Sequence, residues 1–284
     1  MRRVLVVIAI LALAQSVSAA VQYEFRQTTH SDLDSMPSVD MTGRGVIDGD
    51  RSRVEFTSGN GYVPGTYVIS NNGSKTLIFV DPARKTYVDI NAAGVATTIG
   101  AAKISVTNKK VNLTQIDEHP MIAGLPTDHY RLTLDYDITL AFGNIPITQT
   151  VHEVIDKWVT QAFGNVAETF LATGSIKTGN PDLDEIITTE NTKIKGFALK
   201  QTTQVETSAR RAEMPGSKLS DVFRPTRTQI RELTITSIEP KASVPADLFI
   251  VPATYRRPDP LKDDTQKAPL QILSFQPSGG SLDR

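Results

Sequence analysis

The sequence predicts a mainly β protein of the α+β type. We expect a curved antiparallel sheet that forms an unclosed half-barrel, with a short helical insert covering its concave face. Three observations predict this fold: one very long segment of period-two alternation, a series of short alternating segments joined by recognisable turns, and one segment of helical spacing placed between strands.

The long segment runs from Asp128 to Phe142, where every second residue is apolar. Such alternation is typical of a strand with one buried and one wet face. At about 3.3 Å per residue the strand would be roughly 45 Å long, well beyond the usual ~17–20 Å. Because sheets twist, a strand of this length has to curl.

A hairpin follows this strand. The four residues 143–146, GNIP, are a turn candidate, and a turn of that length would place Phe142 opposite Ile147 and Asp137 opposite His152.

The other strands are bounded by turn signals such as Asp48-Gly49-Asp50 and Asn72-Gly73. Gly43 and Gly45 mark a bend or bulge in one of them, and a break is expected near Asn108 in another. About ten strands are expected in all. Besides the long strand, the candidate segments are 21–26, 40–48, 51–57, 66–70, 75–80, 86–90, 104–116, 147–159, 197–207 and 227–238.

The helical insert lies between positions 163 and 196. Phe163, Val166 and Phe170 have helical spacing, and Pro181 opens a second short helix that ends before Gly196. A closed barrel or sandwich and an open curved sheet both fit this order of elements. The insert's position between strands favours the open sheet, whose apolar face it would cover.

Three regions divide the chain. Residues 1–19 have the basic start, apolar run and small residues of a secretory signal peptide. Residues 20–257 form the half-barrel domain, and residues 258–284 are expected to be a disordered tail that contains proline and glycine. The predicted location is therefore the periplasm or the exterior, with no membrane span after cleavage.

The composition argues against a disulfide-bonded protein, a cysteine-linked lipoprotein and a nucleic-acid-binding protein. The chain has no cysteine, so it forms no disulfides and has no lipidated cysteine near the cut. Its net charge is −1, and loss of Arg2 and Arg3 with the signal changes it to −3. No basic field therefore indicates nucleic acid as a partner.

Catalytic motifs are not found, and we predict a protein that is not an enzyme, with no catalytic residue, no metal and no cofactor. One group of residues offers an alternative to this prediction. Asp135, Asp137 and His152 on the wet face of the hairpin could hold a metal or act as an acid–base pair. The alternative is an ordinary cross-strand pair on a solvated face.

The apolar face has two interpretations. It is either a filled core covered by the insert, or the wall of a cavity that takes an acyl chain. The candidate ligand-binding residues under the second interpretation are Val54, Phe56, Tyr130, Leu132, Leu134, Tyr136, Ile138, Leu140, Phe163 and Phe170.

Several short motifs, spread over most of the chain after residue 19, carry a family resemblance. They are FRQ at 25–27, GDRSRVEF at 49–56, NG at 72–73, FVDP at 79–82 with KTY at 85–87, KWV at 157–159, KGFALK at 195–200 and FIVP at 249–252 with Tyr255. The pattern resembles the superfamily of periplasmic lipoprotein carriers, LolA and LppX, and within it a branch of uncharacterised function. The resemblance implies an unclosed antiparallel barrel with helices in its mouth, in a superfamily whose members bind acyl chains or similar ligands.

The predicted function is that of a non-enzymatic exported envelope protein that binds a lipid, acyl chain or other hydrophobic ligand in the half-barrel. An envelope protein or lipoprotein is a candidate partner. The alternative is a structural or interaction module with a filled core and no small ligand, which would engage its partner through edge strands, the 208–225 loop or the tail.

Overall fold

A computed structural model describes residues 20–32, 38–72, 76–91, 103–142, 145–163, 181–182, 184–185, 194–211, 226–241 and 243–258. These residues form an eleven-stranded antiparallel sheet and a separate two-stranded hairpin, which confirms the predicted fold class. In chain order the strands are β1 (Ala20–Ser31), β2 (Val39–Asp48), β3 (Arg51–Gly59), β4 (Tyr67–Ser70), β5 (Thr76–Asp81), β6 (Thr86–Asn91), β7 (Lys103–Ile116), β8 (Met121–Ile122), β9 (Leu125–Pro126), β10 (Asp128–Phe142), β11 (Ile145–Thr160), β12 (Phe197–Arg211) and β13 (Arg227–Lys241).

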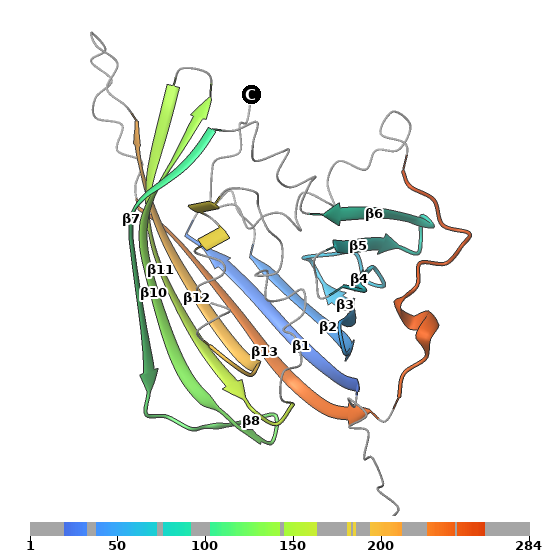
Figure 1. Ribbon diagram of the computed structural model, residues 1–284. Helices are drawn as coiled ribbons and strands as arrows, with labels where there is room; N and C mark the ends of the chain where they lie inside the picture. The colour runs from blue at the N-terminus through green and yellow to red at the C-terminus, as the bar shows by residue number, and fades with distance from the viewer. Residues whose placement is uncertain are drawn as a thin grey trace, which may run out of the picture.

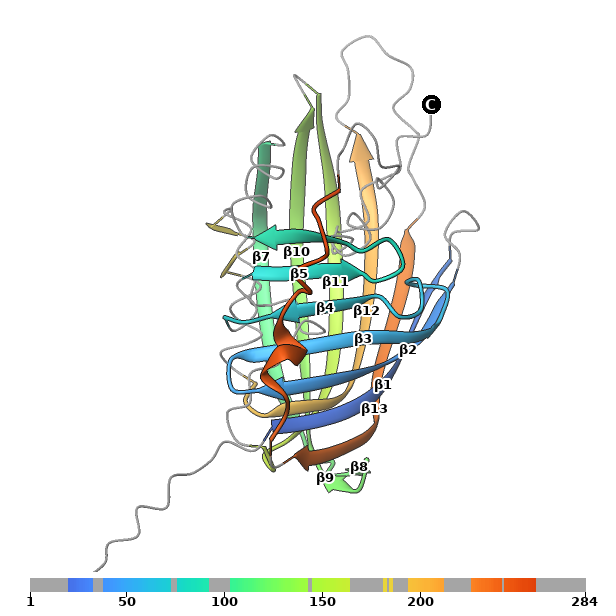
Figure 2. The same cartoon turned by 90° about the vertical axis from the view of Figure 1, so that its right-hand side faces the viewer.

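The large sheet is bent into a trough and does not close. Its strand order is β6-β5-β4-β3-β2-β1-β13-β12-β11-β10-β7, so β6 and β7 are the two edges and are not paired with each other. Figure 1 shows one wall made by β7 and β10–β12 and a second wall made by β3–β6, with β13, β1 and β2 as the floor. In Figure 2 the short strands of the second wall run across the long strands of the first. We call the concave side the inner face and the convex side the outer face.

The bend has a local cause in β1 and β2. Two glycines of β2, Gly43 and Gly45, pair with Phe25 and Tyr23 of β1. A Cβ atom at either glycine would overlap the ring opposite it, so the missing side chains make room for rings that lie across the inner face. The pairing of β1 with β13 shifts after Glu24, and that of β2 with β3 shifts after Thr42, and such bulges increase twist.

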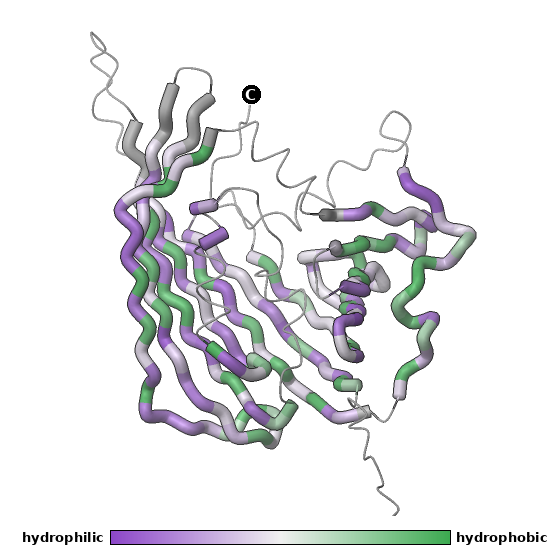
Figure 3. The backbone as a smooth tube through the Cα atoms, viewed as in Figure 1, coloured by the Kyte–Doolittle hydropathy of each residue, from purple (hydrophilic) through white to green (hydrophobic). Residues whose placement is uncertain are grey.

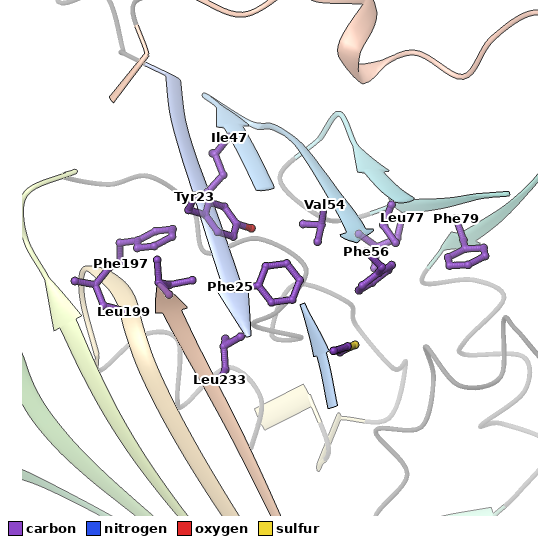
Figure 4. Close-up of a cluster of buried hydrophobic side chains, with 13 residues drawn as sticks. Tyr23, Phe25, Ile47, Val54, Phe56, Leu77, Phe79, Phe197, Leu199 and Leu233 are labelled. Carbon is purple, nitrogen blue, oxygen red and sulfur yellow. The ribbon is translucent and has the colours of Figure 1, made fainter. Parts of the chain in front are cut away.

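An apolar cluster fills the inner face between the floor and the second wall. Side chains from β1, β3, β5 and β12 converge there, as Figure 4 shows. Phe25 packs edge to face on Phe56 with 6.5 Å between ring centres, and Tyr23 packs similarly on Phe197 at 5.7 Å. We call this the first apolar cluster. Its buried members are Tyr23, Phe25, Met41, Ile47, Val54, Phe56, Val68, Leu77, Phe79, Phe197, Leu199, Leu233 and Ile235.

The C-terminal segment covers the outer face of the second wall. It contains the short 3-10 helix η2 (Ala246–Phe249) and passes outside β3–β6 in Figure 1. Phe249 is buried against Tyr67, Ile69 and Val80. The main chain is held as well, because Asn71 donates a hydrogen bond to the carbonyl oxygen of Phe249 at 3.0 Å. The segment therefore packs on the convex side of the sheet.

The predicted hairpin register was wrong by two residues. Phe142 pairs with Ile145 instead of Ile147, and His152 pairs with Asp135 instead of Asp137. Only residues 143 and 144 separate β10 from β11, because two-residue connections match the twist of antiparallel strands better than longer ones. A shift of two leaves every side chain on its predicted face, so the alternation of polar and apolar positions along β10 and β11 is retained (Figure 3).

The break predicted near Asn108 is confirmed as a bulge in the pairing of β7 with β10, where Asn108 has a φ of 56°. The stretch between residues 117 and 126, for which no strand was predicted, contains the β8–β9 hairpin. Alternation could not indicate strands of two residues each.

Of the predicted insert, the structure describes Phe163 and the helical residues 181–182 and 184–185, which lie inside the bend near β7 (Figure 1). Lys109 of β7 donates hydrogen bonds there to Asp182 at 3.1 Å and to Glu185 at 2.5 Å. The signal peptide, residues 259–284 of the tail, most of the 208–225 loop and the rest of the insert lie outside the described residues. Within the described ranges, no helix has the length and apolar character needed to cross a bilayer.

The fit between Gly45 and Tyr23 can be tested by substitution. We expect Gly45→Ala to lower the free energy of unfolding by about 1–3 kcal/mol, because the added methyl group displaces a packed ring. Urea unfolding measures this loss. In a Tyr23→Leu background the same substitution should have a much smaller effect, and an equal loss in both backgrounds would contradict the proposed fit.

The C-terminal cover can be tested at two neighbouring residues. We expect Phe249→Ala to lower the free energy of unfolding by about 3–5 kcal/mol, since Phe249 is 1% exposed and the substitution leaves a cavity. Ile250→Ala is the matched control and should change it by less than about 0.5 kcal/mol, since Ile250 is 59% exposed. Similar losses for both variants in urea unfolding would show that the segment does not pack as described.

Candidate functional site

The apolar stripe of β10 lies on the inner face, and its described members are buried in two adjacent groups. Leu132 and Leu134 pack with Ile155 of β11 and Leu113 of β7. Ile138 packs with Val106 of β7 and Val151 of β11. Tyr136 contacts both groups. We call these groups together the second apolar cluster. Its buried members are Val106, Leu132, Leu134, Ile138, Val151 and Ile155.

The other candidate ligand residues lie elsewhere. Val54 and Phe56 are buried in the first apolar cluster, and Phe163 packs edge to face on Phe197 beside them, with 6.0 Å between ring centres. Tyr130 is half-buried in β10. The side chain of Leu140 and the whole of Phe170 are not among the described parts. Apart from Tyr130, the described candidate residues thus fall into two clusters on the inner face, and ligand binding by them stays a prediction.

A band of polar and charged side chains separates the two clusters. The strand registers place these residues on the same face as Leu233, Ile155 and Phe25. We call this band the polar strip. It consists of Glu153 and Lys157 of β11, Gln201, Thr203 and Thr207 of β12, and Arg227, Gln229 and Arg231 of β13.

Charge is buried in the polar strip. Lys157 is 1% exposed, and the Nε atoms of Arg227 and Arg231 are covered. Burial lowers the pKa of the Arg231 guanidinium below its ordinary value, although Glu153 opposes this shift by favouring the charged form. A buried charge is costly unless other groups compensate it, and Glu153 is one such group for Arg231.

Two tyrosines flank the polar strip from opposite sides. Tyr62, in the connection between β3 and β4, stacks on Phe56 with 4.1 Å between ring centres, and its hydroxyl is within electrostatic range of Arg231. Tyr136 of β10 is within range of Glu153. Burial raises the pKa of Tyr62 to about 12 and raises that of Tyr136 as well, so both are neutral hydrogen-bonding groups at neutral pH.

The polar strip was missed by the sequence-based prediction, although a signal exists. In β13, Arg227, Gln229 and Arg231 have the same odd phase as the buried Leu233 and Ile235. That phase places the arginines on the inner face. The prediction followed apolar alternation alone, which assigns charged residues to the wet side.

The Asp–His constellation on the outer face consists of ordinary cross-strand contacts. Asp135 is 2.7 Å from Nδ1 of His152, whereas Asp137 accepts hydrogen bonds from Thr150 at 2.7 Å and from Asn108 at 2.6 Å. Among the described residues, no group of three or more histidine, aspartate or glutamate side chains is placed to hold a metal ion.

A second group of side chains on the outer face surrounds Trp158. Trp158 stacks on His129 with 4.2 Å between ring centres, and the Lys200 ammonium lies 4.8 Å from the indole. His129 and Arg131 both bond to Asp156, at 2.8 Å and 2.9 Å. Burial raises the pKa of Asp156, but these two hydrogen bonds outweigh burial and the net shift is downward. The group joins β10, β11 and β12 and has a structural role.

The burial of Tyr62 can be tested by titration. Its pKa of about 12 lies above the ordinary value of 10.0, so the neutral phenol stabilises the fold. That contribution is complete below about pH 10 and is lost as the pH rises toward 12. In a phenolate absorbance titration we expect Tyr62→Phe to lose one late-ionising group. Loss of a group that ionises near pH 10 instead would contradict the burial of Tyr62.

Comparisons with known proteins find similarity among solved structures. No protein-family model matches the chain, and no curated protein matches it. Among solved structures, the chain is similar to the LolA superfamily protein NE2245 from Nitrosomonas europaea, at 10% sequence identity and a TM-score of 0.30, over 82% of this chain and 90% of that one. This is the superfamily that the sequence motifs resemble.

Proposed function

We propose that this protein is an exported, non-enzymatic binder of a lipid, an acyl chain or another hydrophobic ligand, held on the inner face of the half-barrel. The observation that carries the proposal is the placement of two apolar clusters on the concave side of a sheet whose edges, β6 and β7, do not pair. A closed barrel would fix the distance between its walls, whereas an open sheet can admit a chain-like ligand from its edge.

The apolar area is adequate for such a ligand. Leu132, Leu134, Tyr136 and Ile138 are every second residue of one strand, so each lies about 6–7 Å from the next in the direction that an extended acyl chain would follow. Each methylene group of a chain that is buried there contributes about 0.8 kcal/mol. A chain of ordinary length therefore gains enough free energy for stable binding without any polar contact.

The complete burial of side chains in the second apolar cluster favours a second function. Leu132 and Val151 are 0% exposed, as in a filled core. A structural or interaction module of the envelope would have such a core, bind no small ligand, and engage its partner through an edge strand such as β7. Uptake of an apolar probe separates the two functions.

We expect the protein to bind a fluorescent fatty acid after organic extraction of any bound lipid, and Leu134→Asp to abolish this binding, since a carboxylate on the apolar stripe is incompatible with a hydrophobic ligand. Val111→Asp should weaken binding without unfolding the chain. Val111 pairs with Leu134 on the same face but is already 38% exposed.

Ser105→Asp is the matched control for these variants. Ser105 lies on the exposed outer side of β7, so its replacement should leave probe binding unchanged. Thermal unfolding monitored by circular dichroism shows whether each variant is folded. If the extracted, folded wild-type protein takes up no apolar probe, the carrier proposal is wrong and the filled-core module is favoured.

A further inference from the structure

The two edges of the large sheet differ in what covers them. At the β6 edge the C-terminal segment adds a short parallel bridge. Tyr87 donates a hydrogen bond to the carbonyl oxygen of Arg256 at 3.0 Å, and Arg256 donates one to the carbonyl oxygen of Lys85 at 3.0 Å. Pro258 follows, and a proline has no N–H group with which to extend such a ladder. The C-terminal segment therefore occupies part of the β6 edge.

The β7 edge is open over residues 110–116, which we call the edge segment. In the part of the chain that the structure describes, β7 pairs with β10 alone and is the outermost strand of the first wall (Figure 1). An edge strand directs unpaired N–H and C=O groups away from its partner. Five of the seven residues are exposed, among them Val111. The edge segment, KVNLTQI, contains no proline or glycine, so it can pair with a further extended strand.

The edge segment has defined ends. Before it, Asn108 has a φ of 56° and the pairing with β10 shifts, and a bulge of this kind interrupts regular pairing. After it, Glu118 donates its N–H to the carbonyl oxygen of Ile116 at 2.8 Å, which turns the chain away from the strand. Seven residues are therefore available for pairing as one regular strand.

The edge segment is complementary to itself when it pairs antiparallel with a second copy about Leu113. In that register Leu113 lies opposite Leu113 of the second copy, and Val111 lies opposite Gln115. Asn112 lies opposite Thr114 on the other face. No two like charges are opposite each other, so the pairing carries no electrostatic cost of that kind.

Charge favours the same register. Lys110 and Glu118 lie about 26 Å apart along one extended copy, too far to meet. In the antiparallel pair Lys110 is opposite Ile116 of the second copy and diagonal to its Glu118, within reach of two long side chains. Lys110 is exposed, and the Glu118 side chain, 3.2 Å from Nδ1 of His129, is still 63% exposed. Two-fold symmetry makes this contact twice.

We propose that two copies of this chain associate through the edge segments of β7, which pair antiparallel about Leu113 and join the two large sheets into one. The same surface is used by both copies, so the assembly closes at two. The two β6 edges become the ends of the joined sheet, and the two inner faces lie on the same side of it. The inference goes beyond the proposed function and does not rest on ligand binding.

Analytical ultracentrifugation of the unmodified protein over a range of concentrations, with no ligand added, tests the association. We expect the mass to rise from that of one chain to that of two. Amide hydrogen exchange of residues 110–116 should slow as the dimer forms, because outward N–H groups become hydrogen-bonded. The mass of one chain at every concentration, or a dimer without slower exchange in this segment, would overturn the proposal.

Charge reversal tests the register. Lys110→Glu and Glu118→Lys should each weaken the dimer by about tenfold or more, because two attractive contacts become two repulsive ones. An equimolar mixture of the two variants should recover the affinity of the unmodified protein. In the mixed dimer each introduced charge meets an opposite charge, which happens only if Lys110 of one copy lies near Glu118 of the other.

Lys195→Glu is the matched control, since it makes the same change of charge at an exposed residue just before β12 and should leave the dimer unchanged. Circular dichroism shows whether each variant is folded, and the exchange measurement on the unmodified protein depends on no variant. If both reversed variants form the dimer as tightly as the unmodified protein, the copies associate elsewhere and the proposal is wrong. It is also wrong if each variant weakens the dimer and their mixture does not recover it.

Discussion

The contact between two aromatic rings and two glycines is the interaction on which the rest of the structure depends. Tyr23 and Phe25 lie across Gly43 and Gly45, which lets the middle of the sheet bend while remaining hydrogen-bonded. With larger residues at those positions, the rings would be displaced and the two walls would splay apart. The first apolar cluster, the position of Phe163 and the approach of Tyr62 to Arg231 all follow from this bend.

The two faces of the sheet have different roles. On the outer face, polar groups form pairs such as Asp135 with His152, and the C-terminal segment covers the apolar part of the second wall. These contacts hold neighbouring strands together. On the inner face, two apolar clusters lie on either side of a charged strip.

Much of the fold could be predicted because the relevant signals are local. Alternation from Asp128 to Phe142 gave the bounds of β10 as observed, and the glycines of β2 indicated its distortion. The hairpin register could not be obtained in this way, because residues 143–146 fit a four-residue turn as well as a two-residue turn followed by pairing of Ile145. The β8–β9 hairpin is too short to produce a periodic signal.

The sequence by itself determined the fold class of the protein. It also determined that residues such as Leu132 and Leu134 point inward, since side-chain direction in a strand follows from period two alone. Only the tertiary structure decided that Arg231 of β13, Glu153 of β11 and Tyr62 of a loop meet within one band. These residues are far apart in the chain, and their proximity depends on strand order and on the bend of the sheet. No local pattern encodes those two properties, because they arise from pairings between separate segments, among them β1 with β13, which lie near opposite ends of the described chain.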